Sequence, residues 1–210
     1  MALRIILADD HCIVRQGIRA LLEGAGFEVV GEAADGQEAI RLVDTLEPDV
    51  VILDLMMPRL NGLDAGRQIR QRHASIPILL LTMHTEEHHV AAALRAGIKA
   101  YVLKTQAAED LVRAIREVVR GHVFLSAAVS RVVVEGYVSG VPAPGDSLAP
   151  RERQVLQLVA EGNTSKEIAV LLGLSVKTVD SYRARVMEKV GVHDTASLVR
   201  YAIRNGVIEA

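Results

Sequence analysis

The chain has 210 residues, of which 50% are hydrophobic and 24% are charged, a composition typical of folded globular proteins and not of disordered ones. Its single cysteine, Cys12, excludes an internal disulfide and a zinc site built from several cysteines, and indicates a reducing compartment. The net charge of −2 is unevenly divided: residues 1–147 hold 15 basic and 19 acidic side chains, whereas residues 148–210 hold 9 and 7, which suggests two domains with different tasks.

The N-terminal sequence MALRIILADDH carries an apolar run of about five residues before two acids, which is too short for a signal peptide. No stretch approaches the roughly 18 apolar residues that a membrane span needs. We therefore expect a soluble, cytoplasmic protein without a membrane segment.

Residues 1 to about 120 alternate short apolar runs with amphipathic segments. The predicted strands are Leu3–Ala8, Phe27–Ala33, Val50–Leu53, Ile76–Thr82 and Ala100–Leu103. The predicted helices between and after them are Ile13–Glu23, Gly36–Leu46, Gly62–Arg72, Glu86–Ala96 and Ala107–Arg120. Because runs that are apolar on both faces suit a parallel sheet buried between helices, the alternation predicts a doubly wound α/β domain.

The pattern weakens after this domain. The segment Gly121–Val138 is apolar and β-branched and is compatible with helix or strand, and Ser139–Ser147 is rich in proline, glycine and serine, as linkers are. Helices are predicted beyond it at Pro150–Glu161, Ser165–Leu172, Val176–Val190 and Thr195–Asn205. We therefore divide the chain into a first domain of residues 1–121, a linker of residues 122–147 and an all-α domain of residues 148–210.

Polar residues gather where the predicted strands end. Asp9 and Asp10 follow the first strand, Asp54 follows the third, Thr82 ends the fourth and Lys104 follows the fifth. Ligands of open α/β sheets bind beyond the carboxyl ends of the strands. Converging carboxylates repel one another unless a cation joins them, and oxygen ligands favour Mg²⁺. A carboxylate is also a nucleophile toward phosphoryl groups, with Lys104 offsetting negative charge and Thr82 donating a hydrogen bond.

Each of these residues also has a plain structural interpretation. Asp9 and Asp10 could cap the following helix, and Asp54 could be an ordinary loop acid. Lys104 alone would be a solvated lysine, and Thr82 alone a strand-end threonine. Their coincidence on one edge of one sheet favours a shared site over five separate explanations.

Four histidines lie near the acid pair or the fourth predicted helix. His84, His88 and His89 stand near the start of the fourth predicted helix, and His84 and His88 have the i, i+4 spacing of a metal pair. No third ligand is close in sequence, so we interpret the three as part of a polar helix surface. His11 beside the acid pair is interpreted as local packing or capping.

Residues 1 to about 120 resemble a response-regulator receiver domain in the acid pair Asp9-Asp10, in Asp54 at the end of VVILDL, in Met57-Pro58 and Gly62, and in Thr82 and Lys104. The resemblance implies a flavodoxin-like, doubly wound five-stranded parallel sheet in the order 2-1-3-4-5. It implies that a sensor histidine kinase phosphorylates Asp54.

The resemblance also assigns roles around the phosphoacceptor. Asp9, Asp10 and Asp54 would hold Mg²⁺ together with the backbone carbonyl of Met56. Thr82 would move toward the phosphoryl group, and Tyr101 would swing inward as the second part of this switch.

The second predicted domain carries the signals of a helix-turn-helix. Residues 164–167 (TSKE) fit a capping box, Gly173-Leu174 make a tight turn, and Ser175 is a good N-cap. The next helix has a valine-lined side and an opposite side that is small and hydrogen-bonding, which suits a DNA major groove. Candidate DNA contacts are Ser165, Lys166, Lys177, Thr178, Asp180, Ser181, Arg183, Ala184, Arg185 and Lys189. A plain four-helix interaction domain would have a similar charged face.

Residues 148–208 resemble a LuxR-type DNA-binding domain in PRERQVL, EGNTSKEIA, LLGLSVKTV, RARVMEKVGV and LVRYAIRNGVI. Both resemblances together are those of the NarL/FixJ family of response regulators. Two positions of this second domain depart from the family. Ala149 replaces the usual threonine N-cap, which should lower helix stability by about 1 kcal/mol. Tyr182 stands where histidine is common and is assigned to packing or a backbone contact.

The resemblance implies a transcription factor that binds a double-stranded DNA operator as a phosphorylation-promoted homodimer, and not a turnover enzyme. The dimer surface is left open between the first and fifth helices, the fourth helix with the fifth strand, and Thr195–Asn205. One alternative is a Mg²⁺-dependent phosphohydrolase with an aspartyl nucleophile, but residues 9–13 (DDHCI) lack the Asp-x-Asp-x-Thr pattern of the haloacid-dehalogenase type. Another is a constitutive DNA binder whose receiver serves only dimerisation.

Overall fold

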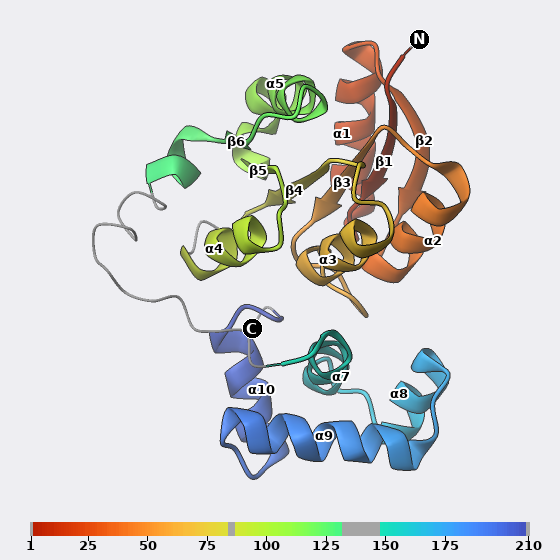
Figure 1. The fold of residues 1–210 in the computed structure, drawn as a ribbon, viewed down its shortest axis with the longest axis vertical. Helices are drawn as coiled ribbons and strands as arrows, with labels where there is room; N and C mark the ends of the chain where they lie inside the picture. The colour runs from red at the N-terminus through yellow and green to blue at the C-terminus, as the bar shows by residue number, and fades with distance from the viewer. Residues whose placement is uncertain (1, 84–86, 132–147, 209–210) are drawn as a thin grey trace. The chain divides into compact units, whose positions relative to one another are not determined.

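The computed structural model describes residues 2–83, 87–131 and 148–208. The chain forms two compact units, Met1–Ala143 and Pro144–Ala210, which are described separately. The first unit is a parallel α/β sheet with helices on both faces, and the second is helical (Figure 1). The predicted fold class is therefore confirmed for both parts.

The sheet of the first unit has the order β2-β1-β3-β4-β5-β6 among the described residues, and every neighbouring pair is parallel (Figure 1). Its strands are β1 (Arg4–Ala8), β2 (Glu28–Ala33), β3 (Val50–Asp54), β4 (Ile78–Thr82), β5 (Ala100–Leu103) and β6 (Phe124–Leu125). The first five confirm the predicted order 2-1-3-4-5.

Alternate side chains of a strand point to opposite faces of the sheet. Both faces of this sheet carry apolar clusters, so helices cover both. On β1, Ile5 and Leu7 join the apolar cluster under α1 (Cys12–Gly24) and α5 (Ala107–Val119). Ile6 and Ala8 join the cluster on the other face. The helices of that face are α2 (Gly36–Leu46), α3 (Gly62–Arg72) and α4 (Glu87–Arg95) (Figure 1). A short 3₁₀ helix, η1 (Lys104–Gln106), connects β5 to α5.

Strand β6 lies in the segment for which the sequence left helix and strand open. The amide of Phe124 donates to the carbonyl of Lys99 at 2.8 Å, and the amide of Ser126 donates to that of Tyr101 at 3.2 Å. Residues 127–131 are helical, and Val129 is fully buried in the same cluster as Tyr101. The predicted linker is therefore wrong in its first ten residues, 122–131, because this apolar segment pairs with the edge of β5. The remaining linker residues, 132–147, lie outside the described ranges.

The second unit contains α7 (Pro150–Ala160), α8 (Ser165–Leu172), α9 (Val176–Val190) and α10 (Thr195–Arg204). All four contribute to one apolar core, in which Leu156, Ile168, Val186 and Leu198 are almost fully buried. The N-cap of α7, Ala149, makes no side-chain hydrogen bond, as its residue type requires. The carboxylate of Glu152 still accepts from the Ala149 amide at 2.8 Å, so half of a capping box remains.

Within the described ranges, no helix combines the length and the apolar character needed to cross a bilayer. His89 is only 4% exposed, so its predicted surface position is wrong. It lies one turn before Ala93, which is buried against the sheet, and residues four apart share a helix face. His84 and the side chain of His88 lie outside the described parts of the structure.

Candidate functional site

The carboxyl edge of the sheet brings two predicted carboxylates and the predicted lysine into direct contact. Asp9 follows β1, Asp54 ends β3, and Lys104 follows β5. The Lys104 ammonium is 2.7 Å from Oδ2 of Asp54 and 2.8 Å from Oδ2 of Asp9. The contact to Asp54 is a hydrogen bond, whereas the contact to Asp9 is an ion pair without hydrogen-bond geometry. One cation thus bridges two buried carboxylates.

The acid pair extends this cluster toward solvent. Asp9 is fully buried, and its Oδ1 accepts from the His11 amide at 2.9 Å. The Asp10 side chain is 32% exposed, and its Oδ1 lies 2.8 Å from Nδ1 of His11. Ligand atoms of Asp9, Asp10, His11 and Asp54 all lie within 4.8 Å of one another. This donor set of mainly carboxylate oxygens, in which one buried Asp9 oxygen accepts no hydrogen bond, fits a divalent cation.

The site has a distinct electrostatic character. Burial raises the pKa of Asp54 from 3.8 to about 6, because desolvation outweighs the opposing effect of Lys104, and the charges of Asp9 and Asp10 add to the rise. Burial also disfavours the charged form of Lys104, but Asp54 and Asp9 together raise the pKa of its ammonium. Three carboxylates therefore share one permanent cation, which leaves an excess of negative charge.

Both predicted switch residues lie inside the first unit. Thr82 ends β4 opposite Leu103 of β5, and Tyr101 lies on β5 opposite Leu80. Each of the two is only 1% exposed. The Tyr101 side chain is thus buried in this structure. Met56, whose carbonyl is the remaining predicted ligand, lies two residues after Asp54 and is partly buried.

The loop after Asp54 folds back tightly on the strand. The amide of Gly62 donates to the carbonyl of Leu55 at 2.9 Å, and the amide of Leu55 donates to that of Leu81 at 2.9 Å. A Cβ atom on Gly62 would overlap the carbonyl oxygen of Asp54 and lie 2.8 Å from its carbonyl carbon. Only glycine therefore lets the start of α3 come this close to the candidate phosphoacceptor.

The second unit has the geometry of a helix-turn-helix. Thr164 and Glu167 form a reciprocal capping box at the start of α8, as predicted. Gly173 ends α8 with a φ of +64°, a left-handed conformation that favours glycine. The Ser175 hydroxyl then accepts from the Thr178 amide at 3.1 Å and caps α9. The two helices are thus joined by a three-residue turn, Gly173–Ser175.

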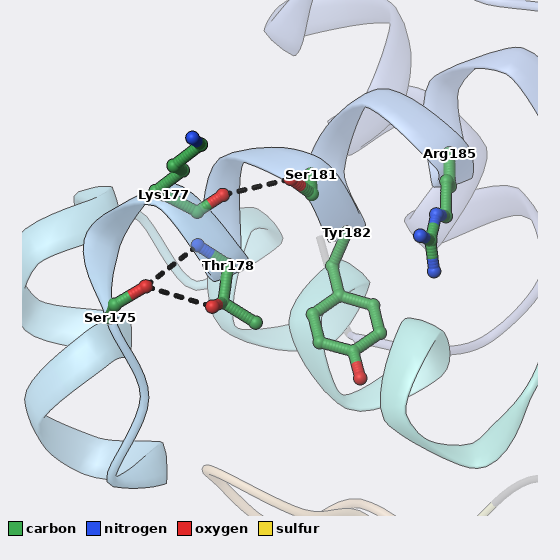
Figure 2. Close-up of a pocket in the computed structure, with 6 residues that line it drawn as sticks. All are labelled: Ser175, Lys177, Thr178, Ser181, Tyr182 and Arg185. Atoms are coloured by element: carbon green, nitrogen blue, oxygen red, sulfur yellow. Dashed lines mark hydrogen bonds between the residues drawn. The ribbon is translucent and has the colours of Figure 1, made fainter.

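The first half of α9 lines a hollow of about 350 Å³. Its residues are Ser175, Lys177, Thr178, Ser181, Tyr182 and Arg185 (Figure 2). The Tyr182 and Arg185 side chains extend next to each other in Figure 2, with the guanidinium carbon 6.0 Å from the ring centre. Tyr182, which the sequence assigns to packing or a backbone contact, packs against the apolar core of the unit and also lines this hollow. Its spacing of four residues from Thr178 and three from Arg185 is the signal that places it on this face.

Five of the predicted DNA contacts use their side chains in hydrogen bonds inside the unit, namely Ser165, Thr178, Ser181, Arg183 and Lys189. Arg183 donates to the hydroxyls of Ser165 at 2.9 Å and Thr195 at 3.2 Å. Lys189 donates to Glu152 Oε2 at 2.6 Å and holds the pKa of that buried carboxyl below its ordinary value. Thr178 is part of the N-cap of α9. The Ser181 hydroxyl donates to the carbonyl of Lys177 at 2.9 Å. The exposed members of the predicted set on this helix are Lys177, Asp180, Ser181, Ala184, Arg185 and Lys189, and Lys166 is exposed on α8.

Comparison with known proteins identifies both domains. Residues 5–116 match the response regulator receiver domain, and residues 146–202 match the luxR family of bacterial regulatory proteins. The response regulator UvrY of Escherichia coli (strain K12) is 36% identical over 211 residues, which cover 99% of this chain and 97% of UvrY. The transcriptional regulatory protein LiaR of Bacillus subtilis (strain 168) is 37% identical over 209 residues, covering 98% and 99%.

A solved structure extends the likeness to three dimensions. RcsB from Salmonella enterica serovar Typhimurium, bound to promoter P1flhDC in the presence of the phosphomimetic BeF3-, is 35% identical with a TM-score of 0.61, and the match covers 96% of this chain and 98% of RcsB. The receiver and the luxR-type helix-turn-helix are thus found here in one chain, as in these relatives. The chain belongs to the NarL/FixJ family of two-component response regulators and is a DNA-binding transcriptional regulator.

Proposed function

We propose that Asp54 accepts a phosphoryl group from a sensor histidine kinase and that this reaction controls dimerisation and operator binding. The observation that carries the proposal is the cluster in which Lys104 bridges Asp54 and Asp9 at 2.7 and 2.8 Å, beside Asp10. In the transfer, an Asp54 carboxylate oxygen forms a bond to phosphorus, while the bond from phosphorus to the donor breaks and its electron pair leaves with the donor.

Each residue of the cluster has a defined task in this proposal. Lys104 is placed to offset the negative charge of the incoming phosphoryl group, and Thr82 to donate a hydrogen bond to it. Asp9, Asp10, Asp54 and the carbonyl of Met56 would hold Mg²⁺, which supplies further positive charge to the phosphoryl oxygens. With a pKa of about 6, Asp54 is ionised at neutral pH and is therefore available as the nucleophile.

The remaining parts of the proposal concern the whole chain. The first unit, which includes β6 and the residues up to 131, acts as the receiver, and residues 148–210 act as the DNA-binding domain. The protein works in the cytoplasm as a homodimer on double-stranded DNA and turns over no external substrate. RcsB, described in one structure as two dimers bound to two parallel DNAs, supports the dimer.

The first experiment measures the intact mass of the full chain after incubation with acetyl phosphate and Mg²⁺. We expect one phosphoryl adduct on the wild type, none on Asp54→Asn, and DNA binding that is tighter by on the order of tenfold after phosphorylation at fixed salt. Asp44→Asn, a change of the same kind at an exposed position of α2, should behave as the wild type does. An unmodified wild type with unchanged DNA affinity would make the receiver a passive dimerisation module.

The phosphohydrolase alternative has its own signature. A turnover enzyme would release many equivalents of phosphate from a small phosphate ester such as p-nitrophenyl phosphate, whereas a phosphoacceptor takes up one. A steady rate of phosphate release by the wild type that is lost in Asp54→Asn would favour the phosphohydrolase alternative.

Two lysines on α9 give a prediction for DNA binding. Lys177 is exposed at the start of the helix, so Lys177→Ala should reduce the slope of log K against log salt concentration by about 0.9. Lys189→Ala removes the same charge but leaves Glu152, which is 4% exposed, without its charged partner and, among the described residues, with only the Ala149 amide as a hydrogen-bond donor. It should lower the free energy of unfolding by about 1–3 kcal/mol and change the salt slope little. Anisotropy titrations of a labelled duplex measure the salt slope, and calorimetry measures the stability. Equal losses of salt slope in the two variants would contradict the different roles given to Lys177 and Lys189.

A further inference from the structure

We propose that Arg15 is a positioning residue for the Mg²⁺-binding acid pair, an inference that rests on the function proposed above. Arg15 lies on α1, one turn after the pair, and its side chain is 17% exposed. Its Nη1 donates to the backbone carbonyl of Asp9 at 2.6 Å, and its Nε donates to Glu32 Oε2 at 3.1 Å. It contacts no carboxylate of the cluster in the described structure and acts through the backbone instead.

The carbonyl that Arg15 holds belongs to the peptide bond between Asp9 and Asp10. Because a peptide group is planar, fixing that carbonyl also fixes the direction in which the chain leaves toward the Asp10 Cα. Asp10 is the more exposed member of the pair, with a side chain 32% accessible to solvent, so the surrounding core restrains it less than it restrains Asp9. The orientation of its carboxylate therefore depends on the backbone that carries it.

The guanidinium is itself anchored to the sheet. Glu32 lies on β2 directly before Ala33, whose carbonyl accepts from the Asp9 amide at 3.1 Å. The end of β2 thus holds Asp9 twice: directly through the amide, and indirectly through Glu32 and Arg15. A planar guanidinium with fixed donor directions can bridge a carboxylate and a carbonyl in this way, which a flexible ammonium does less well.

Arg19 provides a natural comparison one turn further along α1. Its Nη1 donates to Oε1 of the same Glu32 at 2.6 Å, and its Nε donates to Glu23 at 2.8 Å. Arg19 therefore shares with Arg15 the helix, the charge and the partner on β2. Of the two arginines, it is Arg15 that makes the hydrogen bond to the Asp9 carbonyl.

A positioning role and a purely electrostatic role of Arg15 predict opposite changes in Mg²⁺ affinity when the side chain is removed. If Arg15 acted only through its charge, its removal would make the cluster more negative and would strengthen the binding of a divalent cation. If Arg15 holds the Asp9–Asp10 peptide group, its removal lets Asp10 turn away, and cation binding weakens. The direction of the change in Mg²⁺ affinity thus separates the two roles.

The experiment compares the full-length wild type with Arg15→Gln and Arg19→Gln by titration calorimetry with MgCl₂ at pH 7.5. We expect Arg15→Gln to raise the Mg²⁺ dissociation constant about tenfold, as loss of a second-layer partner of a metal ligand typically does, and Arg19→Gln to leave it within about twofold. The rate of labelling by acetyl phosphate should approach that of the wild type when Mg²⁺ is raised to saturation.

A further variant keeps the test decisive if Arg15→Gln lowers stability. The conservative variant Arg15→Lys keeps the positive charge but lacks the planar fork of donors, and it should give an intermediate rise in the dissociation constant. Unchanged or tighter Mg²⁺ binding in Arg15→Gln, or equal weakening in Arg15→Gln and Arg19→Gln, would overturn the positioning role. A wild type that binds no Mg²⁺ and takes up no phosphoryl group would instead refute the proposed function.

Discussion

Gly62→Ala is expected to destabilise the first unit by about 3 kcal/mol and to lower its unfolding temperature by about 10 °C. The added Cβ would overlap the carbonyl oxygen of Asp54, and because the overlapping atoms belong to the backbone, no flexible side chain can move aside. Relief requires the start of α3 to shift, which stretches the bond from the Gly62 amide to the Leu55 carbonyl. The carbonyl of Asp54 would shift as well, so labelling by acetyl phosphate should slow.

Gly17→Ala is the matched control for this change. Gly17 lies inside α1, and nothing lies within 4 Å of the Cβ position there. Alanine has the higher helix propensity, so this variant should be more stable by about 0.5–1 kcal/mol. Differential scanning calorimetry of the two variants measures the contrast. A Gly62→Ala protein with the unfolding temperature of the wild type would mean that the loop after β3 is not held as closely as described.

Asp54→Asn should stabilise the protein by about 3 kcal/mol at pH 7.5 in the absence of Mg²⁺. The folded-state pKa of Asp54 is raised from 3.8 to about 6, so the folded protein binds this proton more tightly than the unfolded chain does. The carboxyl group therefore contributes most to stability below about pH 4, and that contribution is lost as the pH rises to about 6. A shift of about two pH units corresponds to about 3 kcal/mol, and asparagine avoids this loss because it stays neutral.

The pH dependence provides the check. Urea unfolding between pH 4 and pH 8 should show the stability gap between Asp54→Asn and the wild type opening as the pH rises, and Mg²⁺ should narrow it by stabilising the wild type. Asp44→Asn should behave oppositely. His73 and Arg72 lower the pKa of Asp44, so its charge favours the folded state, and this contribution disappears as the pH falls. An Asp54→Asn protein that is no more stable than the wild type at pH 7.5 would contradict the buried-charge argument.

Local patterns were sufficient to predict the regular elements. The bounds of α2, α3, α8 and α9 coincide with the predicted ranges, because their helical periodicity is bounded by residues that cap or end helices. The edge on which Asp9, Asp54 and Lys104 meet was also predictable. Parallel strands end at the same edge of a sheet, so residues 50 positions apart in sequence, such as Asp54 and Lys104, come into contact there.

Features that depend on distant partners were not predictable in this way. Strand β6 has two residues and exists through its pairing with β5, a contact that no periodicity in so short a segment can reveal. Arg183 and Lys189 have the sequence pattern of phosphate contacts, but the pattern does not reveal that Arg183 also binds hydroxyls of Ser165 and Thr195 and that Lys189 binds a buried carboxylate of α7. Arg15 was passed over because its partner is a backbone carbonyl, which no residue type signals.

The two margins of the sheet also bear on how the protein avoids association through its strands. Unpaired strand edges invite pairing with other chains, and short strands, bulges and charged side chains are the usual protection. At one margin β6 has only two residues, so an incoming strand would find little to extend. At the other, β2 carries Glu28 and Glu32, and its register shifts against β1 between Ile5 and Ile6. Both ends of the sheet therefore disfavour edge-to-edge aggregation, which leaves self-association to the helical surfaces.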